Sequence, residues 1–199
     1  LDFRRNKDGV PAVVNSIHAI EEREGEAGRI EILVVRDDLQ AELDGDVNLG
    51  PVQAVVVTDN GVGFTDQNFE SFGTSDSRYK KTYGAKGVGR LLWLKAFEEA
   101  HVESVFEGPE KKLRRTFDFR LSKDGIENVK LEPSNGALPS TIVRLSGMRE
   151  RYRQLCPKKL ETIALKILDH CLIYFTQDDC PRITVSDEHE RLVLNDIYL

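Results

Sequence analysis

The sequence contains few cysteines. Cys156, Cys171 and Cys180 are the only three in 199 residues, and no Cys-X-X-Cys spacing occurs. An odd number of widely spaced cysteines indicates neither a disulfide framework nor a zinc site. We therefore interpret the three side chains as ordinary thiols in or near the core.

Long hydrophobic runs are also missing. No stretch approaches the roughly 18 apolar residues of a membrane span, and no charged-then-apolar signal peptide opens the chain. We therefore expect a cytoplasmic protein with no membrane partner. Because the first residue is Leu1 rather than Met, and an apolar stretch continues to the last residue, we expect the chain to be part of a larger protein.

Positive charge is in deficit. Lys and Arg together number 28 and Asp and Glu 34, which leaves a formal net charge of −6. This balance excludes a protein whose whole surface binds nucleic acid, because that class carries clustered positive charge. A local patch at residues 111–115 still allows contact with nucleic acid. A content of 40% hydrophobic and 31% charged residues is typical of a globular domain.

Hydrophobic periodicity predicts both helices and strands. Apolar residues at three- and four-residue steps predict helices over residues 10–24, 88–100 and 160–175. Short β-branched runs predict strands at residues 29–36, 51–58, 101–107, 113–121, 141–146 and 182–186. This order of elements favours an α+β sandwich with helices on one face of a sheet.

Residues 65–86 form a polar segment without sustained periodicity. A connection of this length is usually a functional lid or is disordered. Between residues 73 and 90, five basic residues stand against the single acidic residue Asp76, so this segment carries a formal charge of +4 in an acidic chain. The asymmetry indicates a site for phosphate groups.

Three motifs follow one another along the chain. Asn15 lies in the first predicted helix, Asp59-Asn60-Gly61-Val62-Gly63 ends a strand, and a glycine cluster at residues 84–89 leads into the second helix. Asn60-Gly61 alone is also typical of a tight turn. The glycines do not match a dinucleotide fingerprint or a phosphate-binding Walker loop, and the protein-kinase motifs are missing.

The three motifs in this order resemble the GHKL ATPase superfamily, whose members include DNA gyrase B, the heat-shock chaperone, sensor histidine kinases, MutL and MORC proteins. The resemblance covers residues 8–147. It implies a Bergerat-type two-layer α/β sandwich, with helices on one face of a mixed, mainly antiparallel sheet, and ATP or ADP with Mg²⁺ as ligands. We expect an ATP-binding domain at residues 1–148. We expect residues 149–199 to supply a helix and a strand that pack on it or lead into a following domain.

The resemblance assigns roles to five residues of the base and metal sites. Asp59 would accept a hydrogen bond from the exocyclic amine of adenine, and a buried acceptor rejects a purine that offers a carbonyl there. Gly61 and Gly63 would let the backbone pass close to the base. Thr141 would contact adenine through water, and Asn15 would hold Mg²⁺ through its carbonyl oxygen.

The triphosphate would lie against the polar segment and the glycine cluster, where backbone N–H groups at the start of a helix face an anion. The residues that the resemblance places there are Thr74, Lys86, Gly87, Val88, Gly89 and Arg90.

The sequence departs from the family at the catalytic position. Members that hydrolyse ATP efficiently carry a Glu four residues before the helix Asn, and here that residue is Pro11. Glu21 and Glu22 lie nearly two helical turns beyond Asn15, so we assign no general base. We interpret His18, which stands where the family often has an Asp, as a half-exposed helix residue rather than a neighbour of a metal ligand.

Three functions stay open at this point. The domain is an ATPase module in which ATP closes the lid and two copies dimerise before slow hydrolysis, or a nucleotide-binding switch that hydrolyses little, or a kinase-type ATP domain. Residues 72–77 resemble the chaperone and MORC members more than the kinases. The biological output is not identified, because one fold serves many functions.

Overall fold

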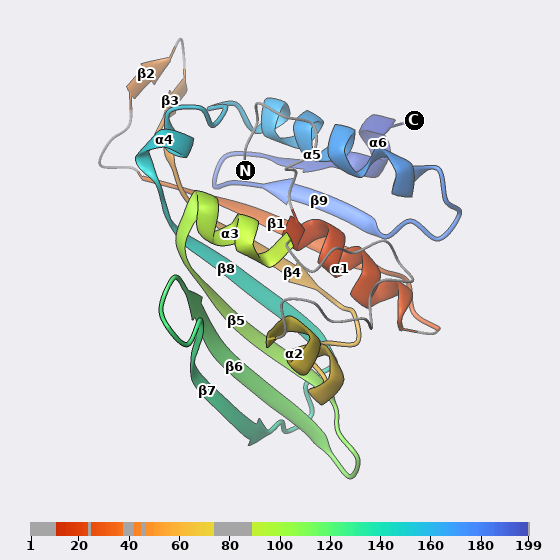
Figure 1. Cartoon of the computed structure of the whole chain (residues 1–199). Helices are drawn as coiled ribbons and strands as arrows, with labels where there is room; N and C mark the ends of the chain where they lie inside the picture. The colour runs from red at the N-terminus through yellow and green to blue at the C-terminus, as the bar shows by residue number, and fades with distance from the viewer. Residues whose placement is uncertain (1–10, 24, 38–41, 45–46, 74–88, 199) are drawn as a thin grey trace.

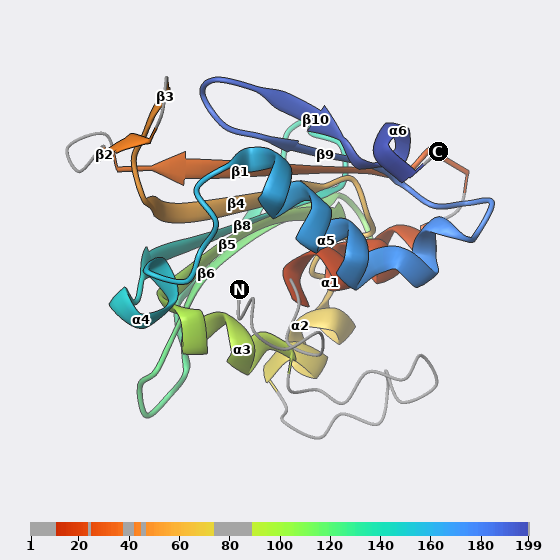
Figure 2. The same ribbon diagram turned by 90° about the horizontal axis from the view of Figure 1, so that it is seen from above.

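The computed structural model describes residues 11–23, 25–37, 42–44, 47–73 and 89–198, and the structural statements below concern these residues. Its centre is a sheet of eight strands, and α1, α2, α3 and α5 lie over one face of it (Figures 1 and 2). The helices are α1 (Pro11–Glu21), α2 (Asp66–Gly73), α3 (Gly89–Ala96), α4 (Glu150–Arg153), α5 (Leu160–Phe175) and α6 (Leu194–Tyr198).

The strands of the main sheet follow the order β10-β9-β1-β4-β8-β5-β6-β7. Only β1 and β9 pair in parallel, and the other neighbours are antiparallel. Their bounds are β1 (Arg29–Arg36), β4 (Val52–Asp59), β5 (Phe97–Glu107), β6 (Lys112–Arg120), β7 (Ile126–Pro133), β8 (Ser140–Met148), β9 (Arg182–Ser186) and β10 (Arg191–Val193). A separate two-stranded sheet consists of β2 (Glu42–Asp44) and β3 (Val47–Leu49). The predicted α+β class with a mixed, mainly antiparallel sheet is confirmed.

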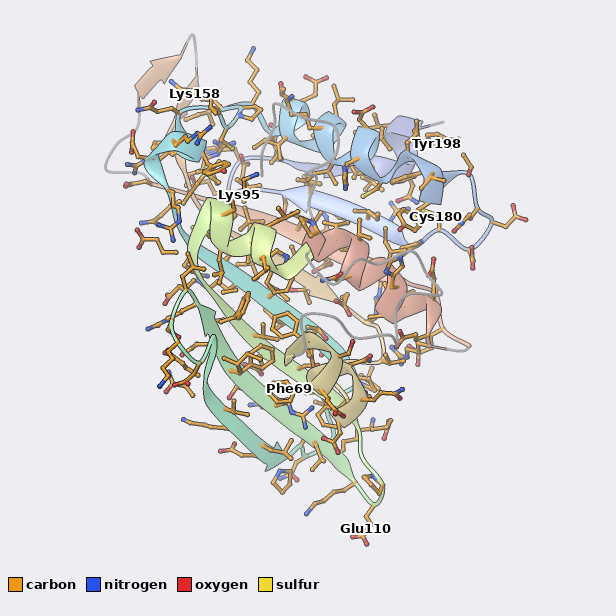
Figure 3. All side chains as sticks on the ribbon, viewed as in Figure 1. Phe69, Lys95, Glu110, Lys158, Cys180 and Tyr198 are labelled. Carbon is orange, nitrogen blue, oxygen red and sulfur yellow. The ribbon has the colours of Figure 1, made fainter. Side chains whose placement is uncertain are left out.

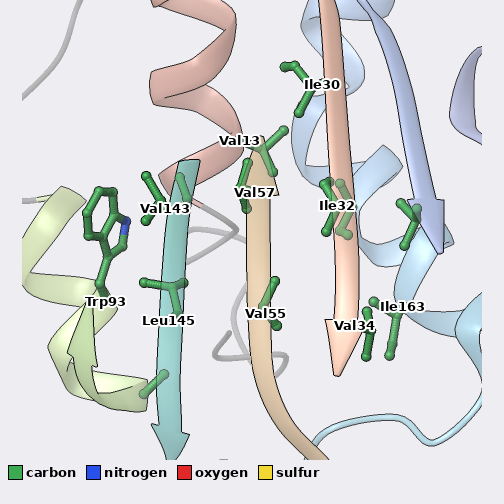
Figure 4. Close-up of a cluster of buried hydrophobic side chains, with 14 of the residues drawn as sticks. Val13, Ile30, Ile32, Val34, Val55, Val57, Trp93, Val143, Leu145 and Ile163 are labelled. Carbon is green, nitrogen blue, oxygen red and sulfur yellow. The ribbon is translucent and has the colours of Figure 1, made fainter. Parts of the chain in front are cut away.

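One continuous core lies between the helices and the sheet. Alternate residues of β1, Ile30, Ile32 and Val34, are buried, as the period of two in a strand requires. Val13 of α1 and Ile163 of α5 belong to the same cluster (Figure 4). The segment after residue 149 therefore contributes a helix to this core, and its strand β9 pairs with β1 in the same sheet.

The helix predicted over residues 88–100 is too long. The structure ends α3 at Ala96, and β5 begins at Phe97. From there the chain pairs with β8, with Phe97 opposite Met148 and Ala100 opposite Leu145. Pairing with an existing sheet outweighs the helical preference of the local residues.

The polar segment predicted as irregular contains a helix at its start. In α2, Phe72 is buried and its ring contacts the rings of Phe117 and Phe119 on β6. The three-residue spacing from Phe69 to Phe72 is too short a pattern to identify a helix from sequence. The strands β2, β3, β7 and β10 were also not predicted.

The sequence predicts an apolar stripe of Leu165, Leu168, Leu172 and Phe175 on the third helix, which is α5 in the structure, and half of that prediction is wrong. Leu168 and Phe175 are buried, whereas Leu165 and Leu172 are 46% and 45% exposed. The buried face instead includes Leu160, Ile163, Ala164, Ile167 and Cys171.

The three cysteines are free thiols, as expected. Burial raises the pKa of Cys156 and of Cys171 to about 12, so both stay protonated at neutral pH. None of the helices among the described residues is long and apolar enough to cross a membrane.

Candidate active site

Three buried polar residues form a row across three neighbouring strands. The strand register places Asp59 at the end of β4 opposite Thr141 on β8, and Thr141 opposite Ser104 on β5. Their exposed fractions are 4%, 4% and 1%. The structure thus brings together two of the predicted adenine residues and adds Ser104, which the sequence analysis missed.

The Asp59 carboxylate is bound from two directions. Its Oδ2 accepts a hydrogen bond of 2.7 Å from the Ser16 hydroxyl on α1, and its Oδ1 accepts one of 2.9 Å from the Gly61 N–H. Burial raises the pKa of Asp59 to about 6, although the hydrogen bonds from Ser16 and Gly61 act in the opposite direction. Each carboxylate oxygen has two lone pairs, so the group can accept a further donor.

Ser104 links the row to the chain that follows the Asp59 motif. Its Oγ accepts a hydrogen bond of 2.8 Å from the Phe64 N–H and donates one of 3.1 Å to the Ser140 carbonyl. It also lies 3.0 Å from Oγ1 of Thr141. The orientation of the Thr141 hydroxyl is therefore coupled to the position of Phe64.

The glycines of the motif are required by contacts within the protein. A Cβ on Gly61 would lie 2.6 Å from the Ala19 carbonyl carbon of α1, and one on Gly63 would lie 2.6 Å from the Val105 oxygen. Gly63 also has a φ of +80°, which glycine adopts without strain. The predicted reason, close approach to a base, is not needed to explain either residue. Asn60 bonds residues 27 and 29 and holds the turn.

Comparison of the sequence with protein-family models found no match, and comparison with curated proteins found none. Solved structures do resemble it. The ATPase region of Saccharomyces cerevisiae topoisomerase II is 14% identical with a TM-score of 0.57, and the match covers 94% of this chain and 48% of that one. The 43K ATPase domain of Thermus thermophilus gyrase B in complex with an aminocoumarin is 15% identical with a TM-score of 0.54, covering 92% of this chain and 44% of that one.

The N-terminal domain of a DNA repair protein is similar at 15% identity and a TM-score of 0.51, with 91% of this chain and 48% of that one covered. The chain has the GHKL ATPase-domain fold. It spans about half the length of the three structures described.

The helix Asn of the GHKL pattern is exposed rather than close to the apolar face. Asn15 points away from the core, whereas its neighbours Ser16 and Ile17 are buried. Its amide oxygen is the kind of hard donor that Mg²⁺ accepts, and its exposure leaves it accessible. Within the described ranges no cluster of three or more His, Cys, Asp or Glu side chains could hold a metal. An ion held at Asn15 would therefore have to take its other oxygens from a nucleotide and water.

No carboxylate replaces the Glu of the GHKL pattern on the turn before Asn15. Pro11 is the first residue of α1. Glu22, directly after the end of that helix, accepts a hydrogen bond of 3.3 Å from Asn68 of α2. His18 lies with Nε2 3.0 Å from the Tyr174 hydroxyl, so it joins α1 to α5.

Most of the predicted phosphate residues lie outside the described ranges, namely Thr74, Lys86, Gly87 and Val88. Gly89 and Arg90 form the first turn of α3, which packs against α1 (Figure 1). Of the predicted phosphate residues, only these two at the start of α3 fall among the described residues, and the phosphate site itself stays a prediction.

The basic run at residues 111–115 is not a free patch. Lys112 pairs with Glu107 at 3.5 Å and Arg114 with Glu103 at 3.4 Å. Arg115 is buried. Three of the four basic side chains in this run are thus ion-paired or buried, and contact with nucleic acid through it stays a prediction.

Proposed function

We propose that this domain binds ATP or ADP, with Mg²⁺, between α1 and the ends of β4 and β8. The observation that carries the proposal is the buried Asp59 carboxylate, held by Ser16 and Gly61 in a row with Thr141. Such a group is expensive to bury unless it receives hydrogen bonds. The exocyclic amine of adenine supplies a donor, and the GHKL fold supports the same placement.

In this proposal each residue contacts a different part of the nucleotide or its metal ion. Asp59 accepts the adenine amine and excludes guanine, whose carbonyl would face it acceptor to acceptor. Thr141 offers its hydroxyl to the base. Asn15 supplies an oxygen for Mg²⁺, which neutralises phosphate charge when bound. Backbone N–H groups at the start of α3, with Gly89 and Arg90, lie nearest the phosphates, and Thr74, Lys86, Gly87 and Val88 stay predictions for the same site.

We further propose that nucleotide acts mainly as a conformational ligand. In the first form, ATP closes the lid and favours a homodimer, and hydrolysis is slow because Pro11 cannot act as a base. The second form is a switch that does not hydrolyse ATP, and a kinase-type domain is the third. Each form places the domain in a larger cytoplasmic protein whose other regions contact the remaining partners, nucleic acid among them.

Titration calorimetry of the purified domain with Mg-ATP and Mg-ADP tests the binding proposal. The Asp59→Asn variant should weaken ATP binding by about 10- to 150-fold, as expected for loss of a hydrogen bond to a charged group. An amide whose oxygen accepts from the Gly61 N–H has an NH₂ group in place of the second acceptor oxygen, so it offers the adenine amine less acceptor capacity.

Asp118→Asn is the matched control, because Asp118 is a partly buried carboxylate on β6 that bonds His101 and Asn128. It should leave the affinity unchanged. If Asp59→Asn binds ATP as tightly as the parent, the adenine assignment is wrong.

A further inference from the structure

Arg115 is a buried arginine on β6, which lies between β5 and the outer strand β7 of the sheet. Its side chain is 5% exposed, although a run of basic residues such as 111–115 is typical of a protein surface. The guanidinium carbon lies 4.5 Å from the centre of the Phe69 ring and 4.9 Å from that of Phe106. Figure 3 labels Phe69 where α2 lies over the sheet. Two ring faces thus hold the cation between α2 and β5.

Within the part of the chain that the structure describes, the hydrogen bonds of the Arg115 guanidinium go to one short segment. Nη1 donates to the Phe64 carbonyl at 2.6 Å and to the Thr65 carbonyl at 2.9 Å. Nη2 donates to the carboxylate of Asp66, the first residue of α2. These three consecutive residues join Gly63 to α2. One side chain is therefore hydrogen-bonded to all three residues that lead from Gly63 into α2.

The same segment is tied to the row of buried polar residues. The Phe64 N–H donates to Ser104, which in turn contacts Thr141. On the other side of Gly63, the Gly61 N–H donates to Asp59. A displacement of Phe64 would therefore reach both the carboxylate and the threonine hydroxyl.

We infer that Arg115 is a positioning residue for nucleotide binding, which acts through residues 64–66 on Asp59 and Thr141 without touching the ligand. The inference rests on the proposed function, because it names a residue that prepares the same site. A preformed site binds more tightly, since less order is lost on binding. The planar guanidinium suits this role because it presents several donors in fixed directions.

A second buried arginine provides a matched control. Arg36 at the end of β1 donates to the Gly50 carbonyl at 3.2 Å, to the Lys158 carbonyl at 2.7 Å and to Asp187 at 2.9 Å. It makes the same kinds of bonds as Arg115. Ile30, six residues before it on β1, pairs with Asp59, so Arg36 lies about 20 Å along the strand from the site. Figure 3 labels Lys158 at this far end of the molecule.

Arg115→Lys and Arg36→Lys should be compared by titration with Mg-ATP, at a temperature where circular dichroism shows both folded. Both variants should melt at a lower temperature than the parent. Only Arg115→Lys should weaken ATP binding, by about tenfold or more, while Arg36→Lys stays within about twofold. Arg115→Met, which keeps an apolar stem between the two rings, replaces the lysine variant if that one does not fold.

Amide hydrogen exchange of the nucleotide-free protein gives a readout that does not depend on binding. Arg115→Lys should speed exchange at the amides of Gly61, Phe64 and Phe69, and Arg36→Lys should not. Parental exchange and parental affinity in Arg115→Lys would overturn the inference, and so would equal loss of affinity in both lysine variants. If the parent itself binds no nucleotide, the proposed function fails, and the exchange pattern alone decides whether Arg115 positions this segment.

Discussion

Two aspartates with buried side chains lie near opposite ends of β1 and have different surroundings. Asp59 is close to its start and Asp187 close to its end. Asp187 follows β9 and pairs with Arg36 at 2.9 Å, in an ion pair whose side chains are each 1% exposed. Burial by itself would raise the pKa of Asp187. The backbone N–H groups of His189 and Glu190 together with Arg36 outweigh that effect and lower the pKa below its usual range.

Asp59 is 4% exposed as a whole residue, and it receives less compensation. Ser16 and Gly61 donate to it, and no ion pair involves it in the part of the chain that the structure describes. Its pKa is raised to about 6, mainly by burial.

The difference separates a structural carboxylate from one suited to a ligand. At the Asp187 end, the fold itself supplies the opposite charge and all the donors. At the Asp59 end, the fold supplies two neutral donors and leaves acceptor capacity unused. Local choices that cost stability without a compensating partner are typical of functional sites.

The two aspartates should differ most strongly in what their substitution does to the free energy of unfolding. Asp187→Asn should lower the free energy of unfolding by about 3–5 kcal/mol, because it leaves the buried Arg36 charge without its partner. Asp59→Asn should not lower it at pH 7, because an amide can accept from Gly61 and donate to Ser16 without the cost of burying a charge. Urea unfolding measures both values.

A loss of 3 kcal/mol or more in Asp59→Asn would contradict the distinction between the two aspartates. It would show that the Asp59 carboxylate stabilises the fold and is not an acceptor for a ligand.

The pH dependence of stability should have opposite signs for the two aspartates. Asp59 has a raised pKa in the folded state, so its stabilising contribution is present below the unfolded pKa of about 3.9 and is lost as the pH rises through about 6. Relative to the parent, Asp59→Asn should therefore gain about 3 kcal/mol between pH 4 and pH 7, from two units at 1.36 kcal/mol each.

Asp187 has a lowered pKa, so its contribution is present above the ordinary aspartate pKa and is lost as the pH falls through the folded value. The deficit of Asp187→Asn against the parent should shrink on acidification. Urea unfolding across this pH range measures both differences, and parallel curves for the two variants would contradict the assignment.

The weakest of these effects should be on the rate of ATP hydrolysis. Pro11→Glu places a carboxylate one turn before Asn15, where it can polarise a water molecule, and should raise phosphate release from ATP by about 10- to 100-fold. Pro11→Gln has nearly the same shape without the acid and should not raise it. Robust turnover by the parent that Pro11→Glu leaves unchanged would show that the base lies elsewhere.

Local patterns predicted much of the fold. Residues 29–36, 160–175 and 182–186 form the expected elements with the expected bounds. Such runs carry their own signal, because β-branched alternation or helical periodicity is confined to neighbouring residues. The strand β7 has no such signal, since most of its residues are exposed on an outer strand of the sheet, and the boundary at Ala96 depends on pairing with β8.

The candidate site, like the fold, has some features that the sequence predicts and others that it does not. Residue types and short spacings alone identify the motif around Asp59 with its two glycines and the lack of an acid at Pro11, whereas the contacts that require the glycines come from α1 and β5. Ser16, Ser104 and Arg115 carry no local pattern. Along the sequence, Ser16 lies 43 residues from Asp59, to which it donates. Ser104 and Arg115 lie 40 and 51 residues from Phe64, to which both are hydrogen-bonded. Only the strand register and the packing of α1 decide these contacts. Burial, and with it the raised pKa of Asp59, follows from the tertiary structure alone.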